Sequence, residues 1–331
     1  MPANLTQQYH KAEQAYRQAT TPQEELDCLQ TMLVELPKHK GTDKLQAELK
    51  QKISRVKKEI SEEGKKGGNK GLSTKIPRQG AGRAVIIGSP NAGKSQLLAS
   101  VTKAKPNIAE YPFSTTQPMP GMMPFEDVYV QLVDTPPITK DMFDATTMGI
   151  IRGAELVLLL LDLGSDDGGE QLLELVEKVN ETKSRLGTET KIDEEDLGVT
   201  YTETWLLENK SDLPEADDRL EFFSEFVDLP FERFSISALH GEGLEPLAKR
   251  VYQAMDVIRV YTKHPKKKEP DMDSPFTIKA GQTLADLAQL IHRDFAENLK
   301  GARVWGANVH DGTPVKADYV LNDKDVVELQ V

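Results

Sequence analysis

Eight residues, Gly88 to Ser95, have the pattern GxxxxGKS. The pattern follows the strand-like run RAVII and precedes a stretch that predicts a helix. In that context main-chain N–H groups curl around phosphate oxygens, and the positive end of the helix points at them. Lys94 would supply a positive charge to the outer phosphates, and the Ser95 hydroxyl a ligand for Mg²⁺. The sequence therefore predicts a phosphate-binding loop.

Two further segments predict magnesium ligands. Asp134 ends the apolar run at residues 128–133, where a carboxylate beside the phosphate loop holds Mg²⁺. Between these motifs lies YPFSTT, at residues 111–116, in which a threonine would reach Mg²⁺ and the terminal phosphate. Each feature has a simpler interpretation, because a strand-ending Asp is common in turns and a proline-flanked segment is typical of connectors. The order of the motifs favours the functional one.

The sequence Asn209-Lys-Ser-Asp212 follows the strand-like run TETWLL and predicts a guanine site. A carboxylate there accepts hydrogen bonds from guanine N1–H and the exocyclic amine, whereas adenine offers no matching pair of donors. An ATPase is therefore disfavoured. Ser237-Ala-Leu239, after the strand-like run ERFSI, is placed to back the base with main-chain donors.

Short apolar runs alternate with amphipathic ones from residue 83 to residue 261. This alternation predicts a mostly parallel sheet with helices on both faces, an α/β domain. The expected strands are residues 84–87, 128–133, 156–161, 203–207 and 231–236, and the clearest expected helices are residues 169–186 and 243–258.

The segment before this domain predicts helices. Two stripes of apolar residues with helical spacing predict an antiparallel helical hairpin within residues 1–63. A glycine- and lysine-rich stretch, residues 64–82, predicts a basic linker. The stripes are Leu26, Leu29, Leu33 and Leu36, and Leu45, Leu49, Ile53, Val56 and Ile60.

The segment after it predicts a small separate domain. Residues 262–274 contain the lysines 266–268 and predict a second linker. In residues 275–331, Thr283 with Asp286 predicts a capping box for a helix over residues 284–298. Strands expected at residues 276–279, 302–309 and 326–330 complete a unit that suits a β-grasp fold.

Composition excludes several classes of protein. The 331 residues carry a formal charge of −12 and one cysteine, Cys28, which excludes a disulfide framework and a thiolate-cage metal site. The six histidines lack HExxH spacing, so a zinc hydrolase is not expected. No signal peptide or membrane-spanning run is apparent, which predicts a cytoplasmic protein with no membrane partner. Residues 38–83 carry a net charge of about +9, which indicates either a phosphate-binding patch or a solvated helix face.

These motifs together resemble a known family. GSPNAGKSQLL, YPFSTTQP and VDTP resemble the Obg-type GTPases of the translation-factor class. IHRDFAENLKGARVWG, with LNDKDVVEL, is similar to the TGS domain of the DRG (developmentally regulated GTP-binding) branch, and LQAELKQKISRVKKEI is similar to that branch's helical leader. The resemblance implies a P-loop GTPase domain, an N-terminal helical hairpin and a C-terminal β-grasp TGS domain. It also implies that the hairpin and the TGS domain contact RNA, ribosomes or a companion protein.

The resemblance assigns roles residue by residue. Thr115, rather than Thr116, corresponds to the family's Mg²⁺-binding threonine, so the expected metal ligands are Ser95, Thr115 and Asp134. Asn91 corresponds to an asparagine that binds K⁺ in related GTPases, although asparagine also simply favours such a turn. The expected catalytic residues are Lys94, Thr115 and Asn91. The expected GTP/GDP-binding residues are Ser89, Pro90, Asn91, Ala92, Gly93, Lys94, Ser95, Gln96, Asn209, Lys210, Asp212, Ser237, Ala238 and Leu239.

The chain departs from the family in two ways. Pro137 stands where the family has a glycine whose N–H contacts the γ-phosphate, and proline has no N–H. Ile138 stands where many GTPases orient water with glutamine, a replacement usual in this family. Only 74 residues separate Asp134 from Asn209, too few for the inserted domain of longer DRG members. We therefore expect a GTP-binding switch with slow hydrolysis. The alternative is a nucleotide-gated or nucleotide-indifferent module that binds RNA or ribosomes with little hydrolysis.

Overall fold

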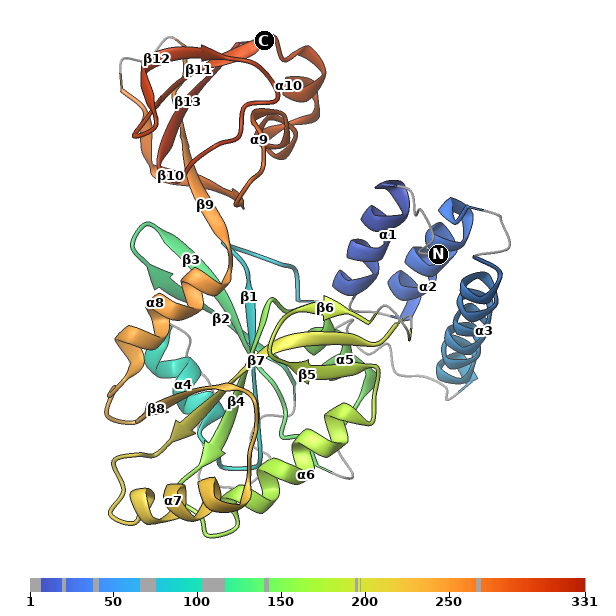
Figure 1. Ribbon diagram of the computed structural model, residues 1–331, viewed down its shortest axis with the longest axis vertical. Coiled ribbons are helices and arrows are strands. Elements are labelled where there is room, and N and C mark those ends of the chain that lie inside the picture. Colours follow the sequence, from blue (N-terminus) through green and yellow to red (C-terminus); the bar gives the residue numbers. More distant parts are fainter. Residues whose placement is uncertain are drawn as a thin grey trace. The chain divides into compact units, whose positions relative to one another are not determined.

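The computed structural model describes residues 7–19, 22–37, 42–65, 76–102, 117–139, 143–193, 196, 198–265 and 269–330. Within them the chain forms two compact units (Figure 1). Unit 1 comprises Met1–Arg78, Arg83–Gly121 and Leu132–Glu245, and unit 2 comprises Gln79–Gly82, Met122–Gln131 and Pro246–Val331. No helix in the described part of the chain has the length and apolar character needed to cross a membrane.

The described part of the N-terminal segment forms three helices, α1 (Gln7–Gln18), α2 (Pro22–Glu35) and α3 (Asp43–Lys65). Of these, α2 and α3 carry the two predicted stripes, and α1 was not expected. Both predicted stripes pack inward where their side chains are described, as at Leu29 and Leu49, each 1% exposed, while the side chain of Ile60 lies outside the described part. The additional helix α1 shares that core through Tyr9 and Tyr16. Those tyrosines are spaced seven residues apart in a polar stretch, so α1 lacks the leucine stripe that marks the other two helices.

An eight-stranded sheet forms the centre of the next part of the chain, with the order β2-β3-β1-β4-β7-β5, while β6 and β8 both pair with β7. Strands β1 and β4 are buried along their whole length. The pairs β1–β4, β4–β7, β5–β7 and β7–β8 are parallel, which confirms the predicted α/β sheet. Its strands are β1 (Arg83–Gly88), β2 (Met119–Phe125), β3 (Val128–Asp134), β4 (Leu156–Asp162), β5 (Ser184–Gly187), β6 (Lys191–Ile192), β7 (Thr200–Asn209) and β8 (Glu232–Ile236).

In the described residues four helices lie between these strands and a fifth, α8 (Leu244–Ala254), leads from β8 to the next sheet; two of the five end earlier than expected. The helix expected over residues 169–186 stops at Asn180, because the chain then turns to pair β5 with β7. The helix expected over residues 243–258 stops at Ala254, and strand β9 follows. The other four helices are α4 (Lys94–Val101), α5 (Ala145–Arg152), α6 (Gly168–Asn180) and α7 (Ala216–Phe226).

The C-terminal sheet starts earlier in the chain than expected. Strand β9 (Val257–Thr262) belongs to this sheet, and β10 (Asp271–Lys279) begins within the expected linker at residues 262–274. The strand order is β10-β9-β13-β11-β12, completed by β11 (Gly301–Gly306), β12 (Val309–Val315) and β13 (Asp325–Gln330).

The helical part of this unit begins as predicted but is interrupted. The capping box is confirmed, since Asp286 N–H donates to Thr283 Oγ1 over 3.4 Å and Thr283 N–H donates to the Asp286 carboxylate over 2.8 Å. The single helix expected over residues 284–298 is instead two helices, α9 (Leu284–Ile291) and α10 (Arg293–Asn298). His292 separates them because its backbone is extended.

Candidate functional site

The loop between β1 and α4 has the backbone geometry of a phosphate cradle. Gly88 ends the buried strand β1, and Lys94 begins α4. Asn91 and Gly93 both lie in the left-handed region, with φ of 61° and 94°. A Cβ at Gly93 would lie 2.3 Å from Asn209 Nδ2, so both the backbone angle and the close approach require glycine. Such alternation of backbone conformation turns successive N–H groups into one concave surface that favours anions.

The Lys94 ammonium is held inside this loop. Its Nζ donates to the main-chain oxygens of Gly88, over 3.1 Å, and of Ser89, over 2.8 Å. The residue is only 5% exposed, and this burial lowers the pKa of Lys94 to about 8 despite the opposing effect of the Asp134 and Asp162 carboxylates. A buried ammonium whose hydrogen bonds within the described residues go to carbonyl oxygens gains from an arriving anion.

Phosphate binding by this loop should therefore weaken as the pH rises. A bound phosphate favours the charged form of Lys94. In the free protein Lys94 is mostly neutral above pH 8, so at higher pH this side chain must take up a proton when phosphate binds. We expect GDP affinity at pH 9 to be about tenfold lower than at pH 7, measured by calorimetry with Mg²⁺. Lys94→Arg is the control, because its side chain stays charged over this range. An equal fall in both proteins would place the titrating group on the nucleotide.

Oxygen donors for a divalent cation meet at the start of α4. Ser95 Oγ donates to Asp134 Oδ2 over 2.5 Å, and Asp134, at the end of β3, is fully buried. A hydroxyl and a carboxylate beside a phosphate cradle are the hard oxygen ligands that Mg²⁺ prefers, so this donor set fits the ion. Thr115 lies outside the described residues. Within the described chain, no three His, Cys, Asp or Glu side chains gather as a metal cluster.

Asn209 ties the phosphate loop to the loop after β8. Its Nδ2 donates to Ala92 O over 2.8 Å, and its Oδ1 accepts from Ala238 N–H over 3.0 Å. The side chain is 1% exposed, so the two loops are held together through a buried amide. The Ala238 N–H, expected to face the base, is thus used by Asn209.

Lys210 reaches a carboxylate that the sequence analysis did not single out. Its backbone is left-handed, with φ of 67°, and its Nζ lies 2.7 Å from Asp162 Oδ2. Asp162 ends β4 and also accepts from Gly164 N–H over 2.8 Å. The sequence could have indicated a role for Asp162, because it ends an apolar strand as Asp134 does.

The Asp212 carboxylate lies at the same end of the sheet, in the turn after β7. Its side chain is 15% exposed, and its Oδ2 lies 3.4 Å from His240 Nε2. The buried Ser237 accepts from His240 N–H over 3.1 Å, whereas Leu239 is 67% exposed. His240 is therefore a neighbour of the predicted base site that sequence reasoning missed.

The remaining predicted residues surround the loop. Gln96 lies on α4 and donates to Ser100 Oγ over 3.2 Å. A cavity of about 570 Å³ adjoins the loop, and its lining includes Ser89, Pro90, Asn91, Ile138, Asp162 and Lys210. Pockets of this size accommodate small-molecule ligands, so the space beside the loop suits a nucleotide.

The segment after Asp134 is buried and lacks polar side chains at its centre. Pro137 is buried, and Ile138 is 3% exposed within the main apolar core. Thr135 is anchored by its hydroxyl, which donates to Ile86 O over 2.8 Å. Neither Pro137 nor Ile138 offers a side-chain group that would orient water.

Comparison with known proteins agrees with this geometry. A family model described as 50S ribosome-binding GTPase matches residues 83–192, and a TGS domain model matches residues 258–330. An uncharacterized GTP-binding protein of Methanocaldococcus jannaschii is 26% identical over 93% of this chain and 93% of its own. Developmentally-regulated G-protein 1 of Arabidopsis thaliana is 26% identical over 92% of this chain and 90% of its own. The chain is therefore a GTP-binding P-loop GTPase similar to the developmentally regulated GTP-binding proteins, with a TGS domain after its GTPase domain.

Proposed function

We propose that the chain is a slow guanine-nucleotide switch whose site is the carboxyl edge of the β1, β3, β4 and β7 strands. The observation that carries this proposal is the buried Asn209 amide, which joins the phosphate loop to the loops expected to hold the base. In this assignment the loop N–H groups and Lys94 hold the phosphates. Ser95, Asp134 and Thr115 hold Mg²⁺, and Asp212 selects guanine. The bound Mg²⁺ neutralises charge on the phosphates.

The chain's own contribution to hydrolysis is positioning and charge. Lys94 is already desolvated, so it stabilises negative charge that develops on the outer phosphate oxygens without reorganising. No protein nucleophile is needed for phosphoryl transfer to water. Slow turnover follows from the missing Pro137 N–H and the apolar Ile138. Asparagine tolerates the left-handed backbone conformation found at position 91, so its presence there needs no bound ion as an explanation. Comparing hydrolysis in Na⁺ and K⁺ tests whether K⁺ has a role.

Calorimetry and phosphate release test the proposal. Titrating GTP into the full chain should give saturable heat with Mg²⁺, a weaker signal with EDTA, and none with ATP. Single-turnover phosphate release should be slow in Na⁺, and a rise in K⁺ would assign the ion a role. Absence of heat with GTP and Mg²⁺ would refute the proposal, and fast turnover in Na⁺ would refute the switch assignment.

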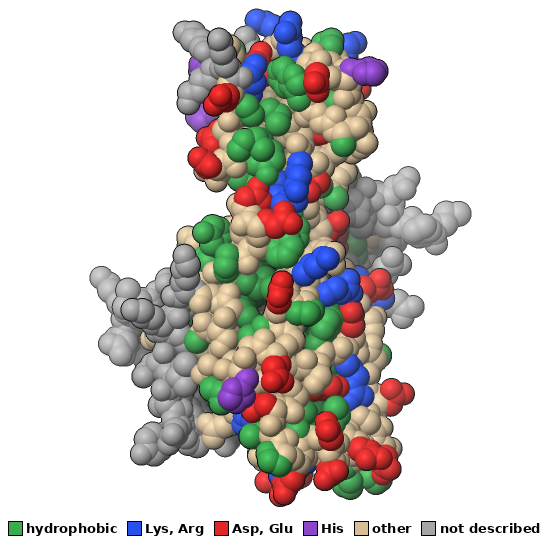
Figure 2. Space-filling view, turned by 90° about the vertical axis from the view of Figure 1, so that its left-hand side faces the viewer, with side chains coloured by type: hydrophobic (Ala, Val, Ile, Leu, Met, Phe, Trp, Pro, Cys, Tyr) green, Lys and Arg blue, Asp and Glu red, His purple; other side chains and the backbone are tan. Residues whose placement is uncertain are grey.

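We further propose that the switch acts on RNA of a ribosome through its N-terminal helices. On α3, the cationic residues Lys50, Arg55 and Lys57 are exposed, while the opposite apolar stripe faces the helical core. Acidic side chains gather instead around α7, at the bottom of the views in Figure 1 and Figure 2, and that surface would repel phosphate. The description of the matching GTPase model as ribosome-binding supports this choice.

Steep dependence on salt is the expected result for such contacts. If three cations of α3 meet phosphates, affinity for ribosomal RNA should fall about fortyfold between 50 and 200 mM salt. Filter binding with the full chain measures this, and Lys50→Gln with Lys57→Gln should reduce the slope by about two. Salt-insensitive binding would indicate a companion protein as the partner instead.

The alternative function, a nucleotide-indifferent binding module, is favoured by one observation. Pro137 is buried and offers no N–H to a γ-phosphate, so the phosphate-sensing step of the switch is impaired. Lys94→Ala separates the two functions. Partner affinity equal to that of the parent chain would support the module, and lower affinity would support the switch.

A further inference from the structure

Arg152, the last residue of α5, contacts residues of the N-terminal helices on several sides. It is 8% exposed, and its Nη1 lies 3.3 Å from Glu25 Oε1 on α2. Its Nη2 donates to Ala19 O, just after α1, over 3.2 Å. The guanidinium also lies over the ring of Tyr16, with 4.8 Å between the carbon and the ring centroid. We call Arg152, Glu25 and Tyr16 the α5 clamp.

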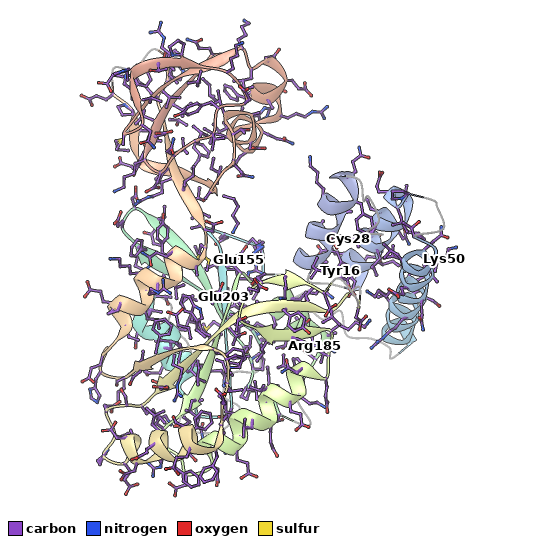
Figure 3. All side chains as sticks on the ribbon, viewed as in Figure 1. Tyr16, Cys28, Lys50, Glu155, Arg185 and Glu203 are labelled. Carbon is purple, nitrogen blue, oxygen red and sulfur yellow. The ribbon has the colours of Figure 1, made fainter. Side chains whose placement is uncertain are left out.

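The members of the α5 clamp support one another. Tyr16, labelled in Figure 3 on the last turn of α1, donates from its hydroxyl to Glu25 Oε1 over 3.0 Å. Burial alone would lower the pKa of Arg152, but Tyr16 and Glu25 outweigh it and raise that pKa above its ordinary value. A buried guanidinium is costly unless such partners are present, so removing the Glu25 carboxylate leaves the charge of Arg152 uncompensated, and removing the Tyr16 hydroxyl takes away a hydrogen bond that holds Glu25 in place.

The last turn of α5 also shares a buried core with the segment that follows Asp134. Ile138 packs in the same buried cluster as Ile150 and Ile151 of α5. The Asp144 carboxylate caps the helix by accepting from Thr147 N–H over 2.7 Å. The last turn of α5 therefore carries both Arg152, which contacts the N-terminal helices, and two isoleucines that share a core with the segment beside the phosphate cradle.

The surroundings of the α5 clamp are polar. A cavity of about 590 Å³ adjoins it, lined in part by Arg152, Glu48, Lys52 and Lys183. Burial and the charge of Lys183 lower the pKa of Lys52 to about 8. The contact between the N-terminal helices and α5 is charged and borders a cavity, so it has less apolar contact than a domain core. Individual ion pairs therefore contribute a larger share of its stability.

We propose that Arg152 is a positioning residue, through which the N-terminal helices hold α5 and thereby the segment at residues 135–139. This rests on the proposed function, because that segment matters only where a γ-phosphate is sensed. By linkage, a nucleotide that moves the segment must also change how firmly the helices are held. The helical bundle is then a regulatory input to hydrolysis as well as a binding surface.

Glu25→Gln and Tyr16→Phe test this in the full chain. Each should slow single-turnover GTP hydrolysis about three- to tenfold and speed amide exchange in α5. Affinity for GDP, which has no γ-phosphate, should change less than twofold. The matched control is Asp27→Asn on α2, an exposed carboxylate that accepts from Gln23, and it should change nothing. The exchanged pair Glu25→Arg with Arg152→Glu should recover part of the rate.

Each outcome bears on the proposal. Faster α5 exchange with unchanged hydrolysis would overturn it, because the clamp would then open without effect on the site. Loss of GDP affinity in both variants would indicate general damage to the domain and would also overturn it. If the parent chain itself binds no GTP, the proposed function fails first, and the variants' α5 exchange still reports whether the clamp exists.

Discussion

Asp212→Asn is expected to change the preferred nucleotide from GTP to xanthosine triphosphate. The carboxylate of Asp212 would accept from guanine N1–H and from the exocyclic amine. An asparagine amide accepts only one of these and turns its NH₂ group toward the amine. Xanthine carries an oxygen at that position, which accepts from the new NH₂ group. A site built around hydrogen bonds rejects the mismatched partner strongly, so GTP affinity should fall about a thousandfold.

The surroundings of Asp212 indicate that Asp212→Asn changes base recognition without disturbing the fold. Asp212 follows the buried Asn209, whose two hydrogen bonds hold the loop in place whichever residue occupies position 212. Its carboxylate lies 3.4 Å from His240 Nε2 and is 15% exposed, so an amide of the same shape fits without strain. The fold should therefore survive, and the change should appear in nucleotide selectivity.

Competition calorimetry with GTP and xanthosine triphosphate measures the result. Asp218→Asn on α7 removes the same charge from an exposed position nearby and should leave GTP affinity unchanged. If Asp212→Asn keeps its preference for GTP, the carboxylate does not read the base, and the assignment of the loop after β7 fails with it.

The phosphate cradle was predictable because the residues that determine its conformation are consecutive in the sequence. Its bent backbone is encoded within eight consecutive residues, in which Gly93 must adopt a conformation that other residues rarely adopt. The same holds for the capping box of Thr283 and Asp286. Strands that are buried on both sides, such as β4, can also be predicted locally, because their sequences are unbroken apolar runs.

Partnerships across the sheet were not predictable in this way. Asp162 meets Lys210 because β4 and β7 run parallel with Asp162 opposite Asn209, a register set by the whole sheet. The first two residues of strand β9, residues 257 and 258, were expected as the end of a helix. This segment becomes a strand by pairing with β13, whose Asp325 lies opposite Val260. Such distant partners override local preference, and no short stretch of sequence contains them.

The α5 clamp shows the same limit at the level of single side chains. Arg152 lies 127 residues from Glu25, and nothing near either residue in sequence indicates the other. An arginine at the end of a helix ordinarily faces solvent and interacts with the helix dipole. Contacts with residues of α1 and α2 and with Ala19 help to bury Arg152.

Pro137→Gly is expected to raise the rate of GTP hydrolysis about a hundredfold. In the family that the chain resembles, the glycine at this position donates its N–H to the γ-phosphate, and Pro137 cannot. A single main-chain donor aimed at developing negative charge commonly changes rates a hundredfold or more. Pro137 is buried, so losing its ring should also lower the free energy of unfolding by about 1 kcal/mol or more.

The neighbouring proline provides the control. Pro136→Gly also adds chain freedom and an N–H, but one residue away from the sensing position, and it should leave hydrolysis within about threefold of the parent rate. Single-turnover phosphate release compares the three proteins at a temperature where each is folded. Equal acceleration in both variants would attribute the effect to a looser segment. No acceleration in either would mean that the buried Ile138 limits the reaction, because an added donor gains nothing if the attacking water is not held in line.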